Sequence, residues 1–231
     1  MRLPVIPDAE PRSAGPRARL SGTSRSESSL RAHAAEIGGR RSQWLVALAA
    51  AFCVAALADI AAADTLPDRL KQCAACHGED GNSKMENIPS LAGQPELFLT
   101  NQMILIRERV RRSEVMEPFV KGLKDDEIVA LAAHYARLEP EPSGETVDQA
   151  VVARGAGLAQ ALRCGSCHHA TYAGQEQIPR LARQRIDYLI KSLVEYRSGI
   201  RSGIDTSMNG VMYGVSGADI RALAHYVASL R

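Results

Sequence analysis

Aromatic residues are scarce in this chain: 3 Phe, 6 Tyr and 1 Trp make up 4% of its 231 residues. So few large side chains predict thin hydrophobic cores, although 45% of the residues are hydrophobic. Domains of under about 100 residues with thin cores often need a metal or a covalent cofactor to be stable. The composition therefore predicts one or two small globular domains rather than a membrane bundle.

A long apolar run is also missing. Residues 44–58 form an apolar stretch that follows Arg40 and Arg41, but the stretch is too short to cross a bilayer comfortably and it ends in small residues. This pattern predicts a secretory signal peptide that is cleaved after Ala58 or after Ala63. An uncleaved membrane anchor is the alternative.

The first 39 residues lack a periodic apolar face and are rich in Arg, Ser, Pro and Gly. Such a composition is typical of disorder. We therefore predict that residues 1–63 comprise a disordered extension followed by the signal peptide, and that the folded protein begins after them.

An overall excess of basic charge is absent as well, since the net charge is only +2. Residues 64–143 hold 10 Lys and Arg against 14 Asp and Glu, whereas residues 144–231 hold 10 against 7, so the two halves carry −4 and +3. This distribution argues against a nucleic-acid partner. It favours a molecule that binds different partners at its two ends, although two ordinary solvated surfaces would look the same.

Cysteines are few, but four of the five form a pattern. Cys53 lies in the apolar run, and the others occur as Cys73-Ala74-Ala75-Cys76-His77 and Cys164-Gly165-Ser166-Cys167-His168. Each is a C-x-x-C-H motif, the signal for covalent attachment of c-type haem. A structural zinc site or a redox disulfide is the alternative, but zinc needs four ligands per site and a disulfide needs no histidine after the second cysteine.

The two motifs belong to an internal repeat with a period close to 91 residues. Each unit contains the haem motif, a Pro-containing loop, a helix, a Met-containing loop and a final helix. The matching segments are IPSLAGQ at 88–94 with IPRLARQ at 178–184, Phe98 with Tyr188, Arg107 with Arg197, and Met116 with Met208.

Helical periodicity is clearest at the end of each unit. Apolar residues recur at helical spacing over 128–138 and again over 220–227, and Ser216 with Asp219 forms a helix start signal. The stretch 139–143 holds two prolines and a serine between charged residues, as is typical of a linker. We therefore predict an all-α fold of two tandem domains, at 64–139 and 147–231, joined by a linker at 140–146.

The motif geometry and the repeat together predict the iron ligands. A C-x-x-C-H motif places its histidine beneath the iron, which assigns His77 and His168, and a methionine on the opposite face is the pairing that raises the haem potential. Only Met116 and Met208 occupy matching positions, so we predict them as the second ligands. Met212, one helical turn after Met208, is the alternative in the second unit.

Other candidates for this site are weaker. Met85 and Met103 match Gln175 and Leu193, and Met103 is expected in the core. His134, His169 and His225 have no counterparts in the other unit, so we interpret them as surface or packing residues.

The prolines of the repeated loop are predicted to act through the axial histidines. A ligating imidazole normally donates its second ring N–H to a fixed acceptor, and a proline in a rigid turn holds a backbone carbonyl in place without a competing donor. Pro89 and Pro179 are assigned this role.

These features resemble a known family, the di-haem class I cytochromes c, and specifically cytochrome c4. The resemblance rests on CAACHGEDGNS, IPSLAGQ, VMEPFVKGLKDDEIVALAAHY, CGSCHHA, IPRLARQRIDYLIKSLVEYRSGIR and MNGVMYGVSGADIRALAHYV, and it covers about residues 66–231. It implies two tandem class I cytochrome c domains, each with a few helices wrapped around one covalent haem c with His/Met ligation. It also implies a periplasmic location and electron transfer toward a terminal oxidase.

Two departures from the family pattern stand out. Gly93 is replaced by Arg183 in the second unit, and if this position needs a positive φ the replacement costs about 1 kcal/mol or more. The second domain is expected to open with a full helix over 147–162, which contains Gly155, whereas few residues precede Cys73 in the first.

The expected function is that of an electron carrier and not an enzyme. The donor would be a membrane quinol-oxidising complex or a dehydrogenase, the acceptor a terminal oxidase of a respiratory chain, and peripheral membrane association is compatible with this role. One alternative is a di-haem subunit of a flavin-containing dehydrogenase complex. Another is a peroxidase-type haem enzyme, which would require an open iron site that two matching methionines argue against.

Overall fold

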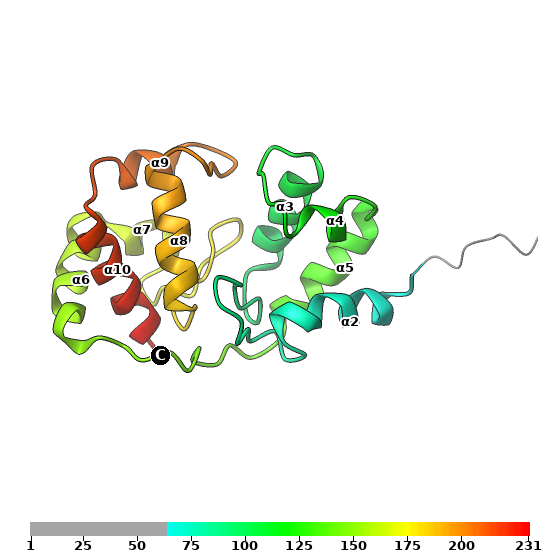
Figure 1. The fold of residues 1–231 in the computed structure, drawn as a ribbon, viewed down its shortest axis with the longest axis horizontal. Coiled ribbons are helices and arrows are strands. Elements are labelled where there is room, and N and C mark those ends of the chain that lie inside the picture. Colours follow the sequence, from blue (N-terminus) through cyan, green and yellow to red (C-terminus); the bar gives the residue numbers. More distant parts are fainter. Residues whose placement is uncertain (1–63) are drawn as a thin grey trace, which may run out of the picture. The chain divides into compact units, whose positions relative to one another are not determined.

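The computed structural model describes residues 64–231 (Figure 1). The predicted extension and signal peptide at 1–63 lie outside the described residues. The described part of the chain is helical, with no β-structure beyond one isolated bridge between Gln175 and Ile178. No helix of residues 64–231 has the length and apolar character needed to cross a membrane.

The helices follow the repeat. The first half contains α2 (Leu66–His77), α3 (Glu96–Arg107), α4 (Glu117–Val120) and α5 (Asp125–Ala136). The second half contains α6 (Gln149–Ala161), α7 (Cys164–His168), α8 (Ile186–Arg197), α9 (Ser207–Met212) and α10 (Gly217–Ser229). The all-α fold predicted from the sequence is confirmed.

The final helix of each half packs as its sequence predicts, and α10 also begins at the predicted start signal. Ser216 caps α10 by accepting a hydrogen bond from the backbone N–H of Asp219 at 3.1 Å. In α5 the Glu127 carboxylate accepts from the backbone N–H of Lys124 at 2.8 Å. The periodic apolar residues of both helices are buried, namely Ile128, Leu131, Ala132 and Tyr135 in α5 and Ile220, Leu223, Ala224 and Val227 in α10.

The Met-containing loops differ from the prediction because each includes a short helix. Met116 is the residue that precedes α4, and Met208 is the second residue of α9. Helices of four and six residues are too short to show an apolar period, so the sequence pattern does not reveal them.

Helix α6 packs closely on α10 in the second half. An added Cβ at Gly155 of α6 would lie 2.1 Å from the backbone oxygen of Ala222 in α10, so the two helix backbones meet at this glycine. Glycine is required at such an approach because any side chain would separate the helices.

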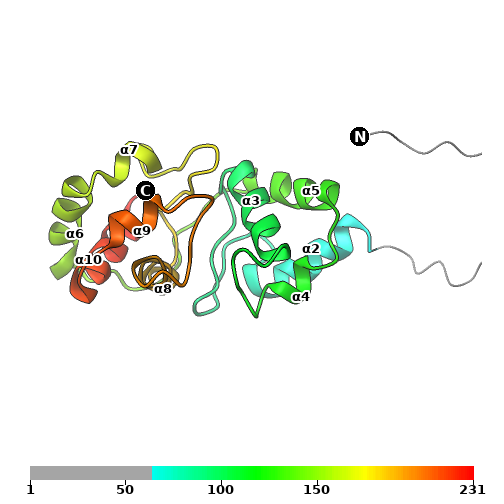
Figure 2. The ribbon, with the colours of Figure 1, turned by 90° about the horizontal axis from the view of Figure 1, so that it is seen from above.

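The two halves meet through a reciprocal pair of glutamines. Gln94 donates to the backbone oxygen of Arg180 and accepts from its N–H, both at 3.0 Å. Gln184 does the same with the backbone of Ser90, both at 2.8 Å. All four residues are buried. Because 94 matches 184 and 90 matches 180 in the repeat, this contact is two-fold symmetric, as in an isologous dimer. The loops that carry these residues lie between the helices of the two halves in both views (Figures 1 and 2).

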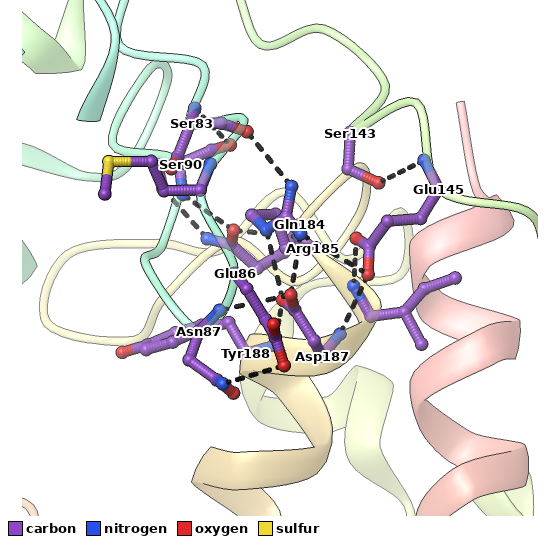
Figure 3. A network of polar contacts seen from close by, with 12 residues as sticks. Ser83, Glu86, Asn87, Ser90, Ser143, Glu145, Gln184, Arg185, Asp187 and Tyr188 are labelled. Atoms are coloured by element: carbon purple, nitrogen blue, oxygen red, sulfur yellow. Dashed lines mark hydrogen bonds and ion pairs between the residues drawn. The ribbon is translucent and has the colours of Figure 1, made fainter. Parts of the chain in front are cut away.

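A second polar contact surrounds Arg185 (Figure 3). Its guanidinium donates to both carboxylate oxygens of Asp187, at 3.1 and 2.6 Å, and it lies 3.4 Å from the backbone oxygen of Ser83 in the first half. Asp187 also accepts from the backbone N–H of Asn87 at 3.1 Å. This ion pair is therefore part of the contact between the halves.

The connection between the halves is bound to both of them. Residues 139–148 form no helix, and the predicted linker at 140–146 falls within them. Asn82 of the first half donates to the backbone oxygen of Glu139 at 3.1 Å and accepts from the N–H of Glu141 at 2.9 Å. Glu145 accepts from the N–H groups of Ile186 and Asp187 at 2.7 and 3.1 Å (Figure 3). It thereby satisfies free donors at the N-terminus of α8.

The replacement of Gly93 by Arg183 occurs at a backbone position with positive φ. The φ angles are 62° at Gly93 and 58° at Arg183. A Cβ at Gly93 would meet the Pro140 ring at 2.9 Å, whereas the Arg183 side chain donates to the Pro140 backbone oxygen at 2.7 Å. The strained arginine therefore also holds the connection between the halves.

Candidate haem sites

In the first half, one helix presents the whole haem motif. Thr65 and Asp68 form a capping box at the start of α2, and the helix runs through both cysteines to His77. Gly78 follows with a φ of 85°, which ends the helix directly after the histidine. Cys73, Cys76 and His77 thus come from consecutive turns of one rigid element, and the His77 side chain is buried.

In the second half, the same motif stands on a separate short helix. Helix α6 ends at Ala161, Arg163 adopts a left-handed conformation with a φ of 57°, and α7 then carries Cys164, Cys167 and His168. His168 is buried like His77. The break before α7 leaves the order of the motif unchanged, so both halves present two thiols next to one buried imidazole.

Each histidine is oriented by the backbone oxygen of the predicted proline. His77 Nδ1 lies 2.8 Å from the Pro89 oxygen, and His168 Nδ1 lies 2.9 Å from the Pro179 oxygen. An Nδ1–H that donates to a carbonyl leaves Nε2 with its lone pair, which is the form that binds a metal. Nε2 of His77 is buried without a hydrogen-bond partner. This orphaned nitrogen fits a haem iron, which would be its partner.

Burial also keeps these groups neutral in the absence of an iron. It lowers the pKa of both imidazoles, while the hydrogen bonds to Pro89 and Pro179 act in the opposite direction. Burial raises the pKa of the Cys73 and Cys164 thiols in the same way. A neutral imidazole is the ligand form, so little proton release would accompany coordination by the histidines.

The two predicted methionine ligands have equivalent surroundings. Met116 is partly buried and packs on the same cluster as Cys73, and Met208 is partly buried and packs on the same cluster as Cys164. Met212 is 1% exposed and belongs to the core of the second half. Its counterpart Val120 is also 1% exposed. The alternative residue therefore occupies a packing position.

The remaining candidates lie where the sequence suggested. Met103 packs on the core of the first half, whereas Met85 is exposed. His169 is exposed and contacts Thr171, and His134 stacks edge-on against Tyr135. His225 is buried, and its Nδ1 accepts from the backbone N–H of Asp148 at 3.0 Å, so it packs α10 against the start of α6.

Sequence reasoning missed the residues that hold the loops around these sites. Asn209 follows Met208 directly, and its side-chain amide donates to the backbone oxygens of Tyr196 and Arg201 at 2.7 and 2.8 Å. The glutamine pair between the halves was missed as well, although its signal was present as the shared Gln at the end of IPSLAGQ and IPRLARQ.

Together, each half offers two thiols, one oriented imidazole and one thioether. Thiols form the covalent links to haem c, and nitrogen and sulfur are the axial ligands of electron-transfer haems. Among residues 64–231 no group of three or more His, Cys, Asp or Glu side chains is arranged to hold a metal ion, as the zinc alternative would need. The residues fit two haem groups.

Comparison with known proteins agrees with this geometry. Residues 152–231 match the family described as cytochrome c, and residues 69–134 match the family described as cytochrome c oxidase, cbb3-type, subunit III. The reduced recombinant cytochrome c4 from Pseudomonas stutzeri superposes with a TM-score of 0.66 at 28% sequence identity, over 73% of this chain and 100% of that one.

Similar sequences also come from di-haem electron-transfer proteins of the cytochrome c4 type and from related electron acceptors. Cytochrome c4 from Thiocapsa roseopersicina is 33% identical over 68% of this chain and 86% of its own length, and cytochrome c4 from Pseudomonas aeruginosa is 32% identical over 68% and 83%. A thiosulfate dehydrogenase electron acceptor from Thiomonas intermedia is 32% identical over 71% and 80%. The chain belongs to the cytochrome c4 family and carries two covalently bound haem c groups.

Proposed function

We propose that this chain is a periplasmic protein that passes single electrons from a membrane quinol-oxidising complex or dehydrogenase to a terminal oxidase. Membership of the family makes it an electron carrier and not an enzyme. The observation that carries the proposal is the duplicated site, in which the Pro89 and Pro179 oxygens orient His77 and His168 in the same way. When bound, each haem supplies an iron that alternates between the ferric and ferrous states by one electron.

The chain's own residues would hold each iron closed to other ligands. Cys73 and Cys76, or Cys164 and Cys167, would hold each haem through thioether links, and His77 or His168 would supply a nitrogen ligand to its iron. Met116 and Met208 are proposed to supply the sulfur ligands, because each packs on the same cluster as the first cysteine of its own motif. A thioether favours ferrous over ferric iron relative to a second imidazole, so this ligand raises the potential of a carrier.

Ligand substitution tests this assignment in the purified holo-protein. We expect Met208→His to lower the midpoint potential of one haem and to remove that haem's share of the weak charge-transfer absorption of Met-ligated ferric iron. Met116→His should do the same to the other haem. Met212→Leu is the matched control and should change neither property. Loss of the absorption in Met212→Leu but not in Met208→His would reverse the assignment in the second half.

Electron transfer itself is tested with isolated membranes. The oxidised protein should become reduced when quinol and membranes containing the quinol-oxidising complex are added, and the reduced protein should become oxidised by membranes containing the terminal oxidase. A protein that exchanges electrons with neither membrane preparation would contradict the proposal.

A second candidate role follows from the comparisons. Besides the relative from Thiomonas intermedia, a solved thiosulfate dehydrogenase from Marichromatium purpuratum superposes with a TM-score of 0.62 at 31% identity, over 69% of this chain and 36% of that one. In this role the chain receives electrons from a periplasmic dehydrogenase, as does the predicted di-haem subunit of a flavin-containing dehydrogenase complex, although the proteins compared are named for thiosulfate. Reduction of the holo-protein by thiosulfate together with a co-purified dehydrogenase, but not by quinol and membranes, would favour this role.

A further inference from the structure

In each half, one arginine bridges the two ends of the segment that carries the predicted methionine ligand. Arg107 is the last residue of α3, and it donates to the backbone oxygen of Leu123 at 2.9 Å. Arg197 is the last residue of α8, and it donates to the backbone oxygen of Val215 at 3.1 Å. Both acceptors directly precede the N-cap of the final helix of their half. Each bond therefore closes the loop between two helices.

This contact is the same in both halves although the loops that it closes are different. The bonded residues are 16 positions apart in the first half and 18 in the second, and the enclosed helices have four and six residues. Both loops end in the same turn, in which the N–H groups of Leu123 and Val215 bond to the oxygens of Val120 and Met212 at 3.0 and 3.1 Å. Two different loops thus end alike and are held by the same arginine contact.

The residue that follows each methionine is held by a different contact in each half. Glu117 accepts from Arg109 Nε at 2.6 Å, and Arg109 is largely exposed. Asn209 instead donates to the backbone oxygens of Tyr196 and Arg201. An exposed ion pair contributes little to stability. Of these contacts, the arginine bond to the end of the loop is the one that the two halves share.

The ends of the loops pack beside the predicted sulfur ligands. Leu123 is buried in the cluster on which Met116 packs, and Val215 packs on the cluster on which Met208 packs. The first cysteine of each haem motif packs on the same cluster. A displacement of the loop end would therefore change the surroundings of the methionine and of the thioether link together.

A methionine needs such support to remain bound to an iron. Its side chain is unbranched and has three rotatable bonds, so its own structure does not fix the sulfur in one place. The contacts around a metal ligand decide how well that ligand is oriented. An arginine that donates to a backbone oxygen suits this task, because its charge strengthens the hydrogen bond.

We propose that Arg107 and Arg197 are positioning residues that keep Met116 and Met208 on the irons by closing the loops that carry them. The inference rests on the proposed function, which assigns these methionines as the sulfur ligands. With the loops closed, the methionines exclude external molecules from the irons. Loss of the arginine contact opens the loop, and a small nitrogen ligand then competes with the methionine. The two arginines thereby prevent ligand binding at sites that serve electron transfer.

Imidazole binding to the oxidised holo-protein tests this role. Arg197→Gln removes the donor to Val215, and we expect it to raise the affinity of one haem for added imidazole by about tenfold to a hundredfold, as for a lost charge-assisted hydrogen bond. The variant should also lose part of that haem's charge-transfer absorption of Met-ligated ferric iron. Arg107→Gln should have the same effects on the other haem. Arg197→Lys keeps a charged donor on a shorter side chain and should give an intermediate affinity.

Two substitutions control for charge and for position on the helix. Lys191→Gln removes an exposed charge from the same helix as Arg197. Glu108→Gln removes an exposed ion-pair partner of Arg107 but leaves the arginine's bond to the end of the loop. Both variants should keep the imidazole affinity and the absorption of the unmodified protein. An equal rise in affinity in Lys191→Gln and Arg197→Gln would assign the effect to lost charge and overturn the inference.

The outcomes separate positioning from folding and from the proposed function. Gln variants that unfold at lower urea concentration but keep the imidazole affinity and absorption of the unmodified protein would limit the arginines to a role in folding and overturn the inference. Where a Gln variant does not retain its haem, the milder Lys variant decides, and an affinity equal to that of the unmodified protein would overturn the inference. These failures leave the potentials of the unmodified protein and its reduction by quinol and membranes intact, whereas loss of that reduction would contradict the proposed function.

Discussion

Each half buries a tyrosine close to its haem motif, but the tyrosine comes from a different segment in the two halves. In the first half Tyr135 of α5 is buried in a cluster that includes Cys73, and Gly81 leaves room for it, since a Cβ there would lie 3.1 Å from its ring. In the second half Tyr172 stands at the place of Gly81, and Val227 stands at the place of Tyr135. Tyr172 is buried in the cluster that includes Cys164. The repeat thus preserves the volume near each haem motif rather than the residue at each position.

The backbone at the exchanged position is the same in both halves. The oxygen of Gly81 accepts from the N–H groups of Leu91 and Ala92, and the oxygen of Tyr172 accepts from those of the matching residues 181 and 182. The φ angles are 74° at Gly81 and 57° at Tyr172. The same turn therefore holds glycine where the final helix supplies the tyrosine ring, and a strained tyrosine where the turn itself supplies it.

The largest difference between the halves should appear at the contact of α6 with α10. Gly155→Ala would place a Cβ against the backbone of Ala222, and we expect a loss of about 3 kcal/mol or more in the free energy of unfolding, as for severe overpacking. Urea unfolding of the holo-protein measures it.

Gly157 is the matched control for this substitution. It lies on the same helix, and an added Cβ there would meet nothing within 4 Å. Gly157→Ala should therefore stabilise α6 by up to about 1 kcal/mol, as expected for glycine replaced in a helix. Similar changes in the free energy of unfolding of the two variants would show that the close approach of α6 to α10 does not determine the effect of Gly155→Ala.

Moving the tyrosine of the first half from α5 to the turn at Gly81 tests whether Tyr135 and Tyr172 fill equivalent spaces in their halves. Gly81→Tyr alone should destabilise the first half, because the new side chain would enter the space of Tyr135. Tyr135→Val alone should leave a cavity that costs about 3 kcal/mol.

The double variant copies the solution of the second half and should recover part of both losses. We expect a favourable interaction energy of about 1–3 kcal/mol in a double-mutant cycle measured by urea unfolding. Additive losses would mean that the two tyrosines do not fill equivalent spaces.

A pH-dependent difference should arise from His225, whose counterpart in the first half is Ala133. Burial lowers the pKa of His225, as does Arg221, whereas Asp148 and Glu145 act in the opposite direction. The unfolded chain therefore takes up a proton at higher pH than the folded one does. The stabilising contribution of the neutral His225 side chain is fully present above the pKa of histidine in the unfolded chain, about 6.5. It is lost as the pH falls below that value.

His225→Gln should reduce this acid sensitivity. A glutamine oxygen can still accept from the N–H of Asp148 but does not titrate. Unfolding measured at about pH 7.5 and about pH 5.5 should show a smaller difference in stability for the variant than for the parent. An equal difference in both proteins would place the acid sensitivity at another group.

The sequence sufficed for features that depend on neighbours along the chain. The haem motifs, the final helix of each half and the start of α10 at Ser216 follow from spacing and local capping, although α5 ends at Ala136, before the last periodic residue Leu138. The repeat supplied Met116 and Met208 as matching residues, and it supplied Pro89 and Pro179, whose oxygens lie within hydrogen-bond distance of the histidines. The roles assigned to these four residues remain predictions for the experiments above.

Features that depend on the packing of distant segments were not predictable in this way. The pairing of Gln94 with Arg180 joins residues 86 positions apart, and no local pattern shows which backbone a glutamine will bind. Likewise, Arg111 and Arg201 can both reach the side-chain oxygen of Gln102 only when the segments that follow α3 and α8 lie close together. Helix α4 was missed because four residues contain only one turn.

The smallest expected difference concerns the exchanged residues Gly93 and Arg183. Arg183→Gly would relieve a positive φ, a gain of about 1 kcal/mol, but it would remove the hydrogen bond to the Pro140 oxygen, a loss of similar size. We therefore expect the free energy of unfolding to change by less than about 1 kcal/mol. Gly93→Ala should cost more, because its Cβ meets the Pro140 ring at 2.9 Å in addition to the strain. A gain in Arg183→Gly as large as the loss in Gly93→Ala would mean that strain alone distinguishes these positions, and that the hydrogen bond of Arg183 to the linker contributes nothing.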